Sequence, residues 1–131
     1  LKNVGSITGT LDILIHDITN TQGSGGTEYE LSGSGELGAN GQMALYLDKN
    51  ENGLFDGSDV GLKSDNTTYS PTTLQYAAIN NYLGNQWTNQ ATLAQNNTLK
   101  FVVNWQIGTG VGNTIQGDSV STNATFTLTQ Q

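Results

Sequence analysis

The sequence predicts an all-β domain, a two-sheet sandwich of the jelly-roll kind with one short helix. Large apolar residues occupy alternate positions in 99–107 and again in 120–128, and the segment 4–18 alternates in the same way. A period of two places these side chains on one face of a strand, whereas a helix would scatter them round its circumference. Turns rich in glycine and asparagine separate the segments, and a helical period occurs once.

Length and composition are those of a single domain with a mostly uncharged surface. The chain has 131 residues, no cysteine and 11% charged residues, against roughly 25% in typical soluble domains. The net charge of −7 argues against nucleic acid and anionic membranes as partners. No apolar run is long enough to cross a membrane, so no membrane span is expected. Neutral amides and hydroxyls suit packing between subunits, because they cost less to desolvate than charges do.

The last part of the chain predicts an antiparallel hairpin. Its first run has apolar residues of one parity, namely Leu99, Phe101, Val103, Trp105 and Ile107. A glycine-rich link at 108–113 follows, and 115–131 repeats the alternation. Two such runs joined by a short glycine-rich loop are typical of paired neighbouring strands.

Short motifs at both ends of the chain resemble one known family. The C-terminal motif is Ile115-Gln-Gly-Asp-Ser-Val120, followed by Phe126-Thr-Leu128 and a glutamine-rich end, and the N-terminal motif is Gly9-Thr-Leu-Asp-Ile13. They are similar to motifs of the TasA/camelysin family, whose members are secreted subunits of biofilm fibres and include archaeal bundling pili. The resemblance implies an extracellular structural subunit, its signal peptide already removed. Its partners would be copies of itself in a filament and other fibres by lateral bundling.

The resemblance also implies a role for residues 1–8, ahead of a sandwich domain at 9–131. In TasA-like fibres the N-terminal strand of each subunit inserts into a groove of the next subunit. Here Leu1, Val4 and Ile7 would be the apolar anchors. A donated strand supplies both the ladder hydrogen bonds and the side chains that its acceptor lacks. The alternative is an ordinary first strand of the sandwich.

One stretch, 48–59, has the spacing of a calcium-binding loop. Candidate oxygen ligands stand at positions 1, 3, 5, 7, 9 and 12, namely Asp48, Asn50, Asn52, the Leu54 carbonyl, Asp56 and Asp59. Gly53 at position 6 allows the sharp turn that brings six or more oxygens to a hard cation. Position 12 is aspartate instead of glutamate, and a predicted strand precedes the loop. We expect a calcium ion with a structural role, with an acidic turn that binds no ion as the alternative.

Other elements follow from local signals. Ser70 as N-cap, Pro71 at the first helical position and Gly84 beyond the last turn predict a helix over 70–83. The remaining apolar runs predict strands at 27–37, 42–47 and 60–65. In the polar connection 84–97, Trp87 and Leu93 are the expected buried side chains.

Catalytic chemistry is not expected, although some camelysin-like proteins are described as metallopeptidases. The chain has one histidine, His16, which leaves no zinc triad and no H-E-x-x-H motif. A hydrolase triad would need a hydroxyl partner for His16 that no motif marks. The alternative function is a calcium-stabilised carbohydrate-binding or adhesin module, with Trp87 or Tyr76 stacking on sugars. The sequons at Asn66, Asn96 and Asn123 are candidate glycosylation sites, with unmodified asparagine as the alternative.

Overall fold

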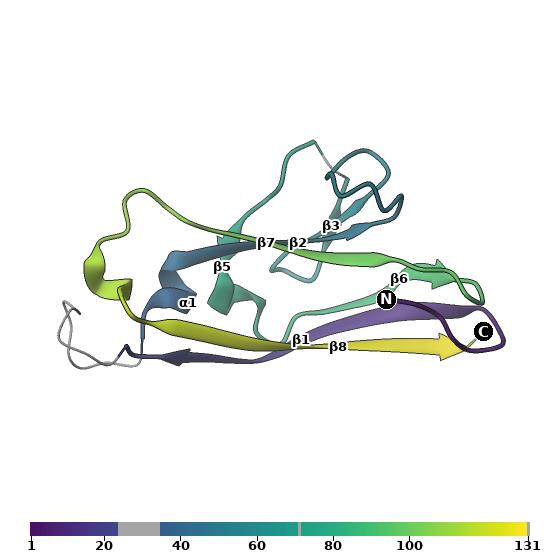
Figure 1. The fold of residues 1–131 in the computed structure, drawn as a ribbon, viewed down its shortest axis with the longest axis horizontal. Helices are drawn as coiled ribbons and strands as arrows, with labels where there is room; N and C mark the ends of the chain where they lie inside the picture. Colours follow the sequence, from purple (N-terminus) through teal and green to yellow (C-terminus); the bar gives the residue numbers. More distant parts are fainter. Residues whose placement is uncertain (24–34, 71, 131) are drawn as a thin grey trace.

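The computed structural model describes residues 1–23, 35–70 and 72–130, and these form an elongated two-sheet sandwich (Figure 1). The first sheet has the order β6–β1–β8, with β1 (Gly9–Thr21) between β6 (Gln86–Leu93) and β8 (Ser119–Gln130). All its pairings are antiparallel. The predicted all-β sandwich is therefore confirmed, and the alternation over 4–18 becomes a strand from Gly9 onward.

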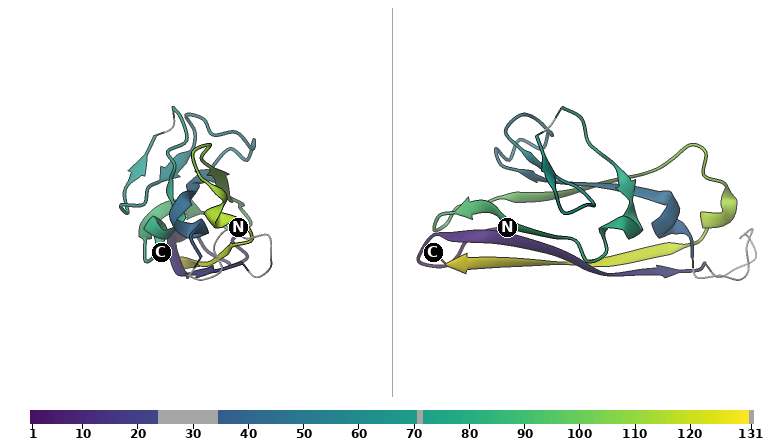
Figure 2. Two further views of the ribbon diagram at one scale, coloured as in Figure 1. Left: turned by 90° about the vertical axis from the view of Figure 1, so that its left-hand side faces the viewer. Right: turned by 180° about the vertical axis from the view of Figure 1, so that it is seen from behind.

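The second sheet is organised around β2 (Gly41–Asp48). On one side β2 pairs along its whole length with β7 (Lys100–Ile107). On the other side it pairs with the short strands β3 (Val60–Leu62) and β5 (Ala77–Ala78), and β4 (Thr68–Tyr69) extends the sheet beyond β3. Seen from behind, the long β1–β8 pair runs beneath this second sheet (Figure 2).

The core lies between β1 and β2 because both strands place apolar side chains on the facing sides. Leu11, Ile13 and Ile15 alternate with more exposed residues along β1, which is the predicted period of two. The other buried apolar side chains are Met43, Leu45, Leu47, Leu62, Ile79, Tyr82, Trp87, Leu93 and Leu99. Trp87 and Leu93 are 1% and 5% exposed, as predicted for these two side chains.

The outer face of β2 is buried too, because the chain between β2 and β5 folds over it. The rings of Tyr46 and Phe55 lie 4.9 Å apart between centroids, and those of Phe55 and Tyr69 lie 5.6 Å apart. Gly61 lies under the Tyr69 ring, where a Cβ atom would come within 2.1 Å of a ring carbon. Because this aromatic stack covers its outer face, β2 is buried on both faces, and its sequence is a nearly continuous run of apolar residues.

The predicted C-terminal hairpin is wrong. Strands β7 and β8 both form, but β7 pairs with β2 and β8 pairs with β1, so the two strands belong to opposite sheets. Their connection crosses from one sheet to the other through a 3-10 helix, η2 (Asn113–Ile115). A glycine-rich link indicates that the chain turns, but it does not indicate whether the next strand pairs within the same sheet.

The predicted helix over 70–83 is also wrong in extent. The chain enters β5 at Ala77, and only Ile79–Tyr82 is helical, as the 3-10 helix η1. Of the apolar residues at helical spacing, Ile79 and Tyr82 are buried by tertiary packing, whereas Leu83 is 57% exposed. Local propensity cannot anticipate this packing. The α-helix is a single turn elsewhere, α1 (Leu37–Asn40), and β6 occupies part of the predicted polar connection.

Most of the predicted strand at 27–37 lies outside the described residues, and its last residue, Leu37, begins α1. The predicted strand at 42–47 is confirmed as β2. The prediction at 60–65 is confirmed for the three residues of β3.

Residues 1–8 precede β1 and lie against the connection between β6 and β7. Leu1 and Leu99 exchange two main-chain hydrogen bonds, of 2.8 and 2.9 Å. The side chain of Asn3 is 2% exposed and donates to the Leu93 carbonyl oxygen at 2.8 Å. Asn3 therefore anchors the segment, whereas the apolar side chains around it stay largely in solvent.

Candidate functional site

Strand β7 exposes large apolar side chains that its sequence pattern assigns to a core. Val103, Trp105 and Ile107 are 51%, 63% and 43% exposed. They share parity with Phe101, whose ring lies 5.1 Å from that of Phe126 in the opposite sheet. All four side chains therefore belong to the face of β7 that looks toward the other sheet. Within the described part of the chain, Phe101 is the only one of the four with a ring contact to the opposite sheet.

The exposure arises because the sandwich is open along one side. Strand β7 pairs with β2 and β8 pairs with β1, and among the described residues neither has a strand on its other edge. Two parallel rows of main-chain donors and acceptors thus remain available, one on each sheet. Half-buried Val120 of β8 lies across the opening from β7.

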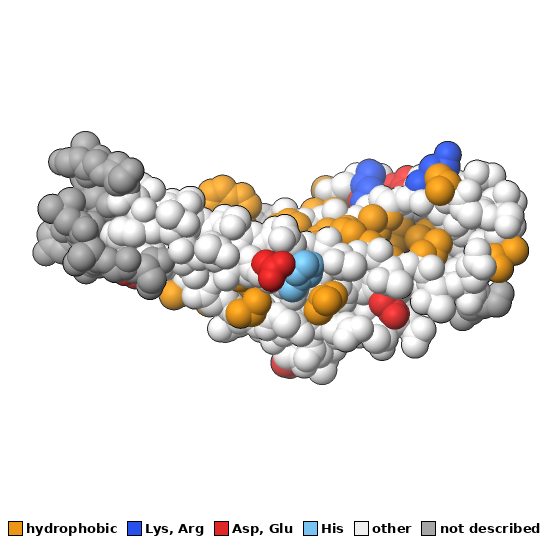
Figure 3. Space-filling view, turned by 90° about the horizontal axis from the view of Figure 1, so that it is seen from below, with side chains coloured by type: hydrophobic (Ala, Val, Ile, Leu, Met, Phe, Trp, Pro, Cys, Tyr) orange, Lys and Arg blue, Asp and Glu red, His pale blue; other side chains and the backbone are white. Residues whose placement is uncertain are grey.

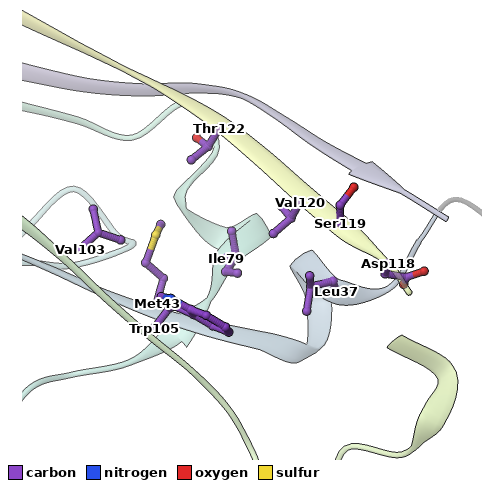
Figure 4. Close-up of a pocket in the computed structure, with 9 residues that line it drawn as sticks. All are labelled: Leu37, Met43, Ile79, Val103, Trp105, Asp118, Ser119, Val120 and Thr122. Carbon is purple, nitrogen blue, oxygen red and sulfur yellow. The ribbon is translucent and has the colours of Figure 1, made fainter. Parts of the chain in front are cut away.

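Between these two edges lies an apolar groove of about 390 Å³. Figure 4 shows Val120 on β8, with Met43 and Trp105 on the opposite sheet and Ile79 and Leu37 between them. Met43 and Ile79 are buried and form the floor. Its remaining lining residues are Val103, Asp118, Ser119 and Thr122. The groove is therefore an incompletely covered part of the core, with Asp118 and Ser119 at one end.

Asp118, within the C-terminal motif, secures the polar end of the groove. Its carboxylate accepts main-chain hydrogen bonds from Gly23 at 3.0 Å and from Glu36 at 2.6 Å. Gly117 beside it has φ +89°, a conformation that favours glycine. The motif that resembles the fibre family thus forms the turn into β8 and joins β8 to the chain around α1.

The predicted donor anchors are exposed and do not enter the groove of their own chain. Leu1, Val4 and Ile7 are 41%, 85% and 42% exposed. In Figure 1 the N-terminus lies near the end of the molecule where β8 finishes, whereas α1, which borders the groove, lies toward the other end.

The predicted calcium ligands lie in one compact loop between β2 and β3. Asp48 and Asp59 are 0% and 4% exposed, and Asn50, Asn52 and Leu54 are exposed. Among the described residues, no three carboxylate or histidine groups already stand close enough together to hold a metal. The loop therefore carries its oxygen atoms in the predicted order, but three of its carboxylates are not gathered within ligand distance of one another.

His16 meets both a carboxylate and a hydroxyl on the outer face of the first sheet. Its Nδ1 lies 2.5 Å from Asp17 Oδ2, and its Nε2 lies 2.9 Å from Thr125 Oγ1 of β8. Figure 3 shows the histidine beside an acidic side chain in the middle of this face. Hydrogen bonds from Asn123 and then from His16 hold the pKa of Asp17 below its usual value. Sequence reasoning missed Thr125, because cross-strand register alone brings it to His16.

The three sequons lie on exposed positions, and each asparagine has a local structural partner. Asn66 accepts a hydrogen bond from the Gln86 main chain at 2.9 Å. Asn123 donates to Asp17 at 3.3 Å, and the Asn96 main chain bonds to Asn3. Two of the three, Asn66 and Asn96, have positive φ angles.

The sugar-stacking role suggested for Trp87 is wrong, because this side chain is in the core with its Nε1 donating to the Thr67 carbonyl oxygen. Tyr76 is half-buried, and the exposed tryptophan is Trp105 in the groove.

Comparison of this chain with protein-family models, with curated proteins and with solved structures finds no match. No helix in the described part of the chain has the length and hydrophobicity needed to cross a membrane. The function must therefore be argued from the groove and its surroundings.

Proposed function

We propose that this chain is a structural subunit of an extracellular fibre or pilus, polymerising by donation of a β-strand from each copy to the next. The observation that carries the proposal is the apolar groove between the unpaired edges of β7 and β8. An incoming strand would find ladder partners at these edges and a row of apolar side chains between them.

The groove favours a strand that carries apolar side chains along its length. Such a strand would cover Val103, Trp105 and Ile107, which are at least two-fifths exposed in the single chain. Full burial of a large apolar side chain is worth about 1.5–3 kcal/mol, so three partial burials give a useful share of an association energy. Part of that gain offsets the translational and rotational entropy that two subunits lose when they associate.

Residues 1–8 are the proposed donor because their apolar side chains are also incompletely buried. Val4 is 85% exposed, and Leu1 and Ile7 are about half as exposed. Release of the segment would break four main-chain hydrogen bonds with the β6–β7 connection and the buried bond from the Asn3 side chain to the Leu93 carbonyl oxygen. New ladder bonds in the groove would replace the main-chain bonds, and increased apolar burial on both partners would offset the loss of the Asn3 contact.

The positions of the donor segment and of the groove in one subunit favour a filament over a closed dimer. The N-terminus lies near one end of the long axis, and α1 and the groove lie toward the other (Figure 1). A head-to-tail contact between unlike surfaces repeats along a filament unless its rotation closes a ring.

Negative-stain electron microscopy of the purified chain tests this function, with deletion of residues 1–8 as the first variant. We expect filaments from the full chain and dispersed monomers from the deletion. Because the deletion also removes the buried Asn3, a second variant, Val4→Asp, should block assembly while leaving the fold intact. Ser6→Asp, at an exposed polar position of the same segment, is the matched control and should still assemble. Normal filaments from the deletion variant would disprove strand donation by this segment.

A carbohydrate-binding module is the second candidate, favoured by the 63% exposure of Trp105 at the groove. An aromatic side chain in an open groove can stack on a sugar ring. Dispersed single-domain particles from the full chain, together with a positive glycan array that Trp105→Ala abolishes, would support this function over the fibre.

A further inference from the structure

The loop between β2 and β3 is folded around its own side-chain oxygens. Gly53, at its sharpest turn, has φ +80°. The side-chain oxygen of Asn50 accepts the Asn52 N–H at 3.2 Å, and that of Asn52 accepts the Leu54 N–H at 2.7 Å. Each amide oxygen has a second lone pair. These bonds therefore orient the oxygen and leave one lone pair available to a ligand.

The carboxylate of Asp59 closes the loop by joining its two ends. One oxygen accepts the Lys49 N–H at 3.0 Å, and the other accepts the Asp56 N–H at 2.9 Å. Asp59 is 4% exposed, so the closure is sheltered from water. Lys49, Asp56 and Asp59, at positions 2, 9 and 12 of the loop, are thereby held together without a ligand.

The decisive observation is a buried carboxylate oxygen that has no partner. Asp48 is 0% exposed, and its Oδ2 accepts the Gly53 N–H at 2.8 Å. Its Oδ1 is buried and receives no hydrogen bond from any residue that the structure describes. A buried carboxylate oxygen without a donor carries a desolvation cost that native structures rarely leave uncompensated. The group that would compensate it must be positively charged or a strong donor.

Lys100 does not fill this role. Its Nζ lies 3.9 Å from Asp48 Oδ2, the oxygen that Gly53 already serves, and it donates to the Glu51 carbonyl oxygen. The Lys100 side chain is 49% exposed, and a single ammonium group cannot balance Asp48, Asp56 and Asp59 together.

We propose that residues 48–59 bind one calcium ion. The ligands would be Asp48 Oδ1, the side-chain oxygens of Asn50, Asn52 and Asp56, and the Leu54 carbonyl oxygen, with Asp59 closing the set. Hard oxygen ligands in a flexible loop with two or three carboxylates suit calcium better than magnesium, which requires near-ideal octahedral geometry. Asp56 now accepts amide hydrogens from Asn50 and Asn52, at 3.2 and 2.7 Å, and the ion would take over that neutralisation.

The site is placed to stabilise the second sheet. Asp48 is the last residue of β2 and stands opposite Lys100, the first residue of β7, while Asp59 directly precedes β3. A bound ion would therefore join the end of β2 to the start of β3. This inference does not depend on the fibre, because the loop and the groove share no residues.

Calcium titration of the full chain by calorimetry, at constant ionic strength, tests the proposal. Loops of this type bind with dissociation constants between about 10⁻⁶ and 10⁻³ M, so we expect saturation by millimolar calcium and a higher melting temperature. Asp48→Asn should weaken binding about tenfold or more. Asp56→Asn, at a more exposed position, should do the same and serves if Asp48→Asn does not fold.

Glu51→Gln is the matched control, because it removes one charge from the same loop at a position that supplies no side-chain ligand. It should bind calcium within about threefold of the wild-type affinity. Absence of binding at about 10 mM calcium would overturn the proposal. An equal loss in Glu51→Gln and Asp48→Asn would also overturn it, since that result indicates diffuse attraction to an acidic loop.

Discussion

The Tyr82 hydroxyl donates a hydrogen bond to the main-chain carbonyl oxygen of Met43, 3.0 Å away in the core. The bond joins η1 to β2 at a point where β2 also pairs with β5 and β7. Met43 and Ile79, the first residue of η1, line the floor of the groove. The position of the groove floor therefore depends on this contact between two distant parts of the chain.

Replacing Tyr82 with phenylalanine should lower the free energy of unfolding by about 1 kcal/mol, because the ring stays packed while the Met43 carbonyl loses a donor. Urea denaturation followed by tryptophan fluorescence measures the change. Tyr76→Phe is the control, since the Tyr76 hydroxyl makes no hydrogen bond with the described residues, and it should change stability by less. Equal effects of the two substitutions would argue against a role for the Met43 contact.

Burial raises the pKa of Tyr82 to about 12 from an ordinary value of 10.0. The folded chain therefore retains this proton between pH 10 and 12, whereas the unfolded chain releases it. The resulting stability is fully present below pH 10 and is lost as pH rises toward 12. Urea denaturation at several alkaline pH values should show the wild-type chain losing stability faster than Tyr82→Phe. Parallel losses in the two chains would contradict this assignment.

Gly61→Ala should destabilise the outer aromatic stack. The added methyl would lie 2.1 Å from the Tyr69 ring, which packs against Phe55 and cannot move away freely. Overpacking of this kind costs about 1–3 kcal/mol, measurable by thermal unfolding. Gly57→Ala, where a methyl meets open space, is the matched control and should change the melting temperature little. A Gly61→Ala chain as stable as the control would mean that the stack adapts readily.

Acid should weaken the cross-strand contact at Asp17. Because the folded-state pKa of Asp17 is below its usual value of 3.8, its contribution is present above pH 3.8 and is lost as pH falls through the lower folded value. The stability difference between the wild type and Asp17→Asn should therefore shrink as pH falls below 3.8. Asn123→Ala should reduce this pH dependence, because Asn123 is the largest cause of the shift. A difference that stays constant down to pH 2 would contradict this.

Trp105→Lys should reduce filament length without lowering the stability of the single chain, because this side chain is 63% exposed there. The proposed partner strand would bury it, and a lysine in an apolar groove carries a desolvation cost. Electron microscopy and urea denaturation give the two readouts. Asn104→Lys, at the neighbouring position on the opposite face of β7, should assemble normally. Short filaments from both variants would show that added charge on β7, rather than the groove, limits assembly.

Much of the all-β architecture could be predicted from alternation alone. Leu11, Ile13 and Ile15 in β1 are buried as their parity requires, and the strand from Met43 to Leu47 lies where its apolar residues predicted it. The order of oxygens in the loop 48–59 was equally visible, because ligand spacing in a short loop is a local property. Local patterns such as these determine strands, turns and candidate ligands.

Strand partners and the covering of each face depended on contacts that are distant in sequence. The same alternation buries Leu99 and leaves Trp105 in solvent, because β8 pairs with β1 and is separated from the far part of β7 by the groove. The helical spacing at Ile79 and Tyr82 became a 3-10 turn between two sheets for the same reason. The alternation in residues 99–107 was enough to show that β7 needs an apolar partner. Long-range pairing supplies that partner from the same chain only at Phe101, because β7 and β8 pair with different sheets and their edges are held apart.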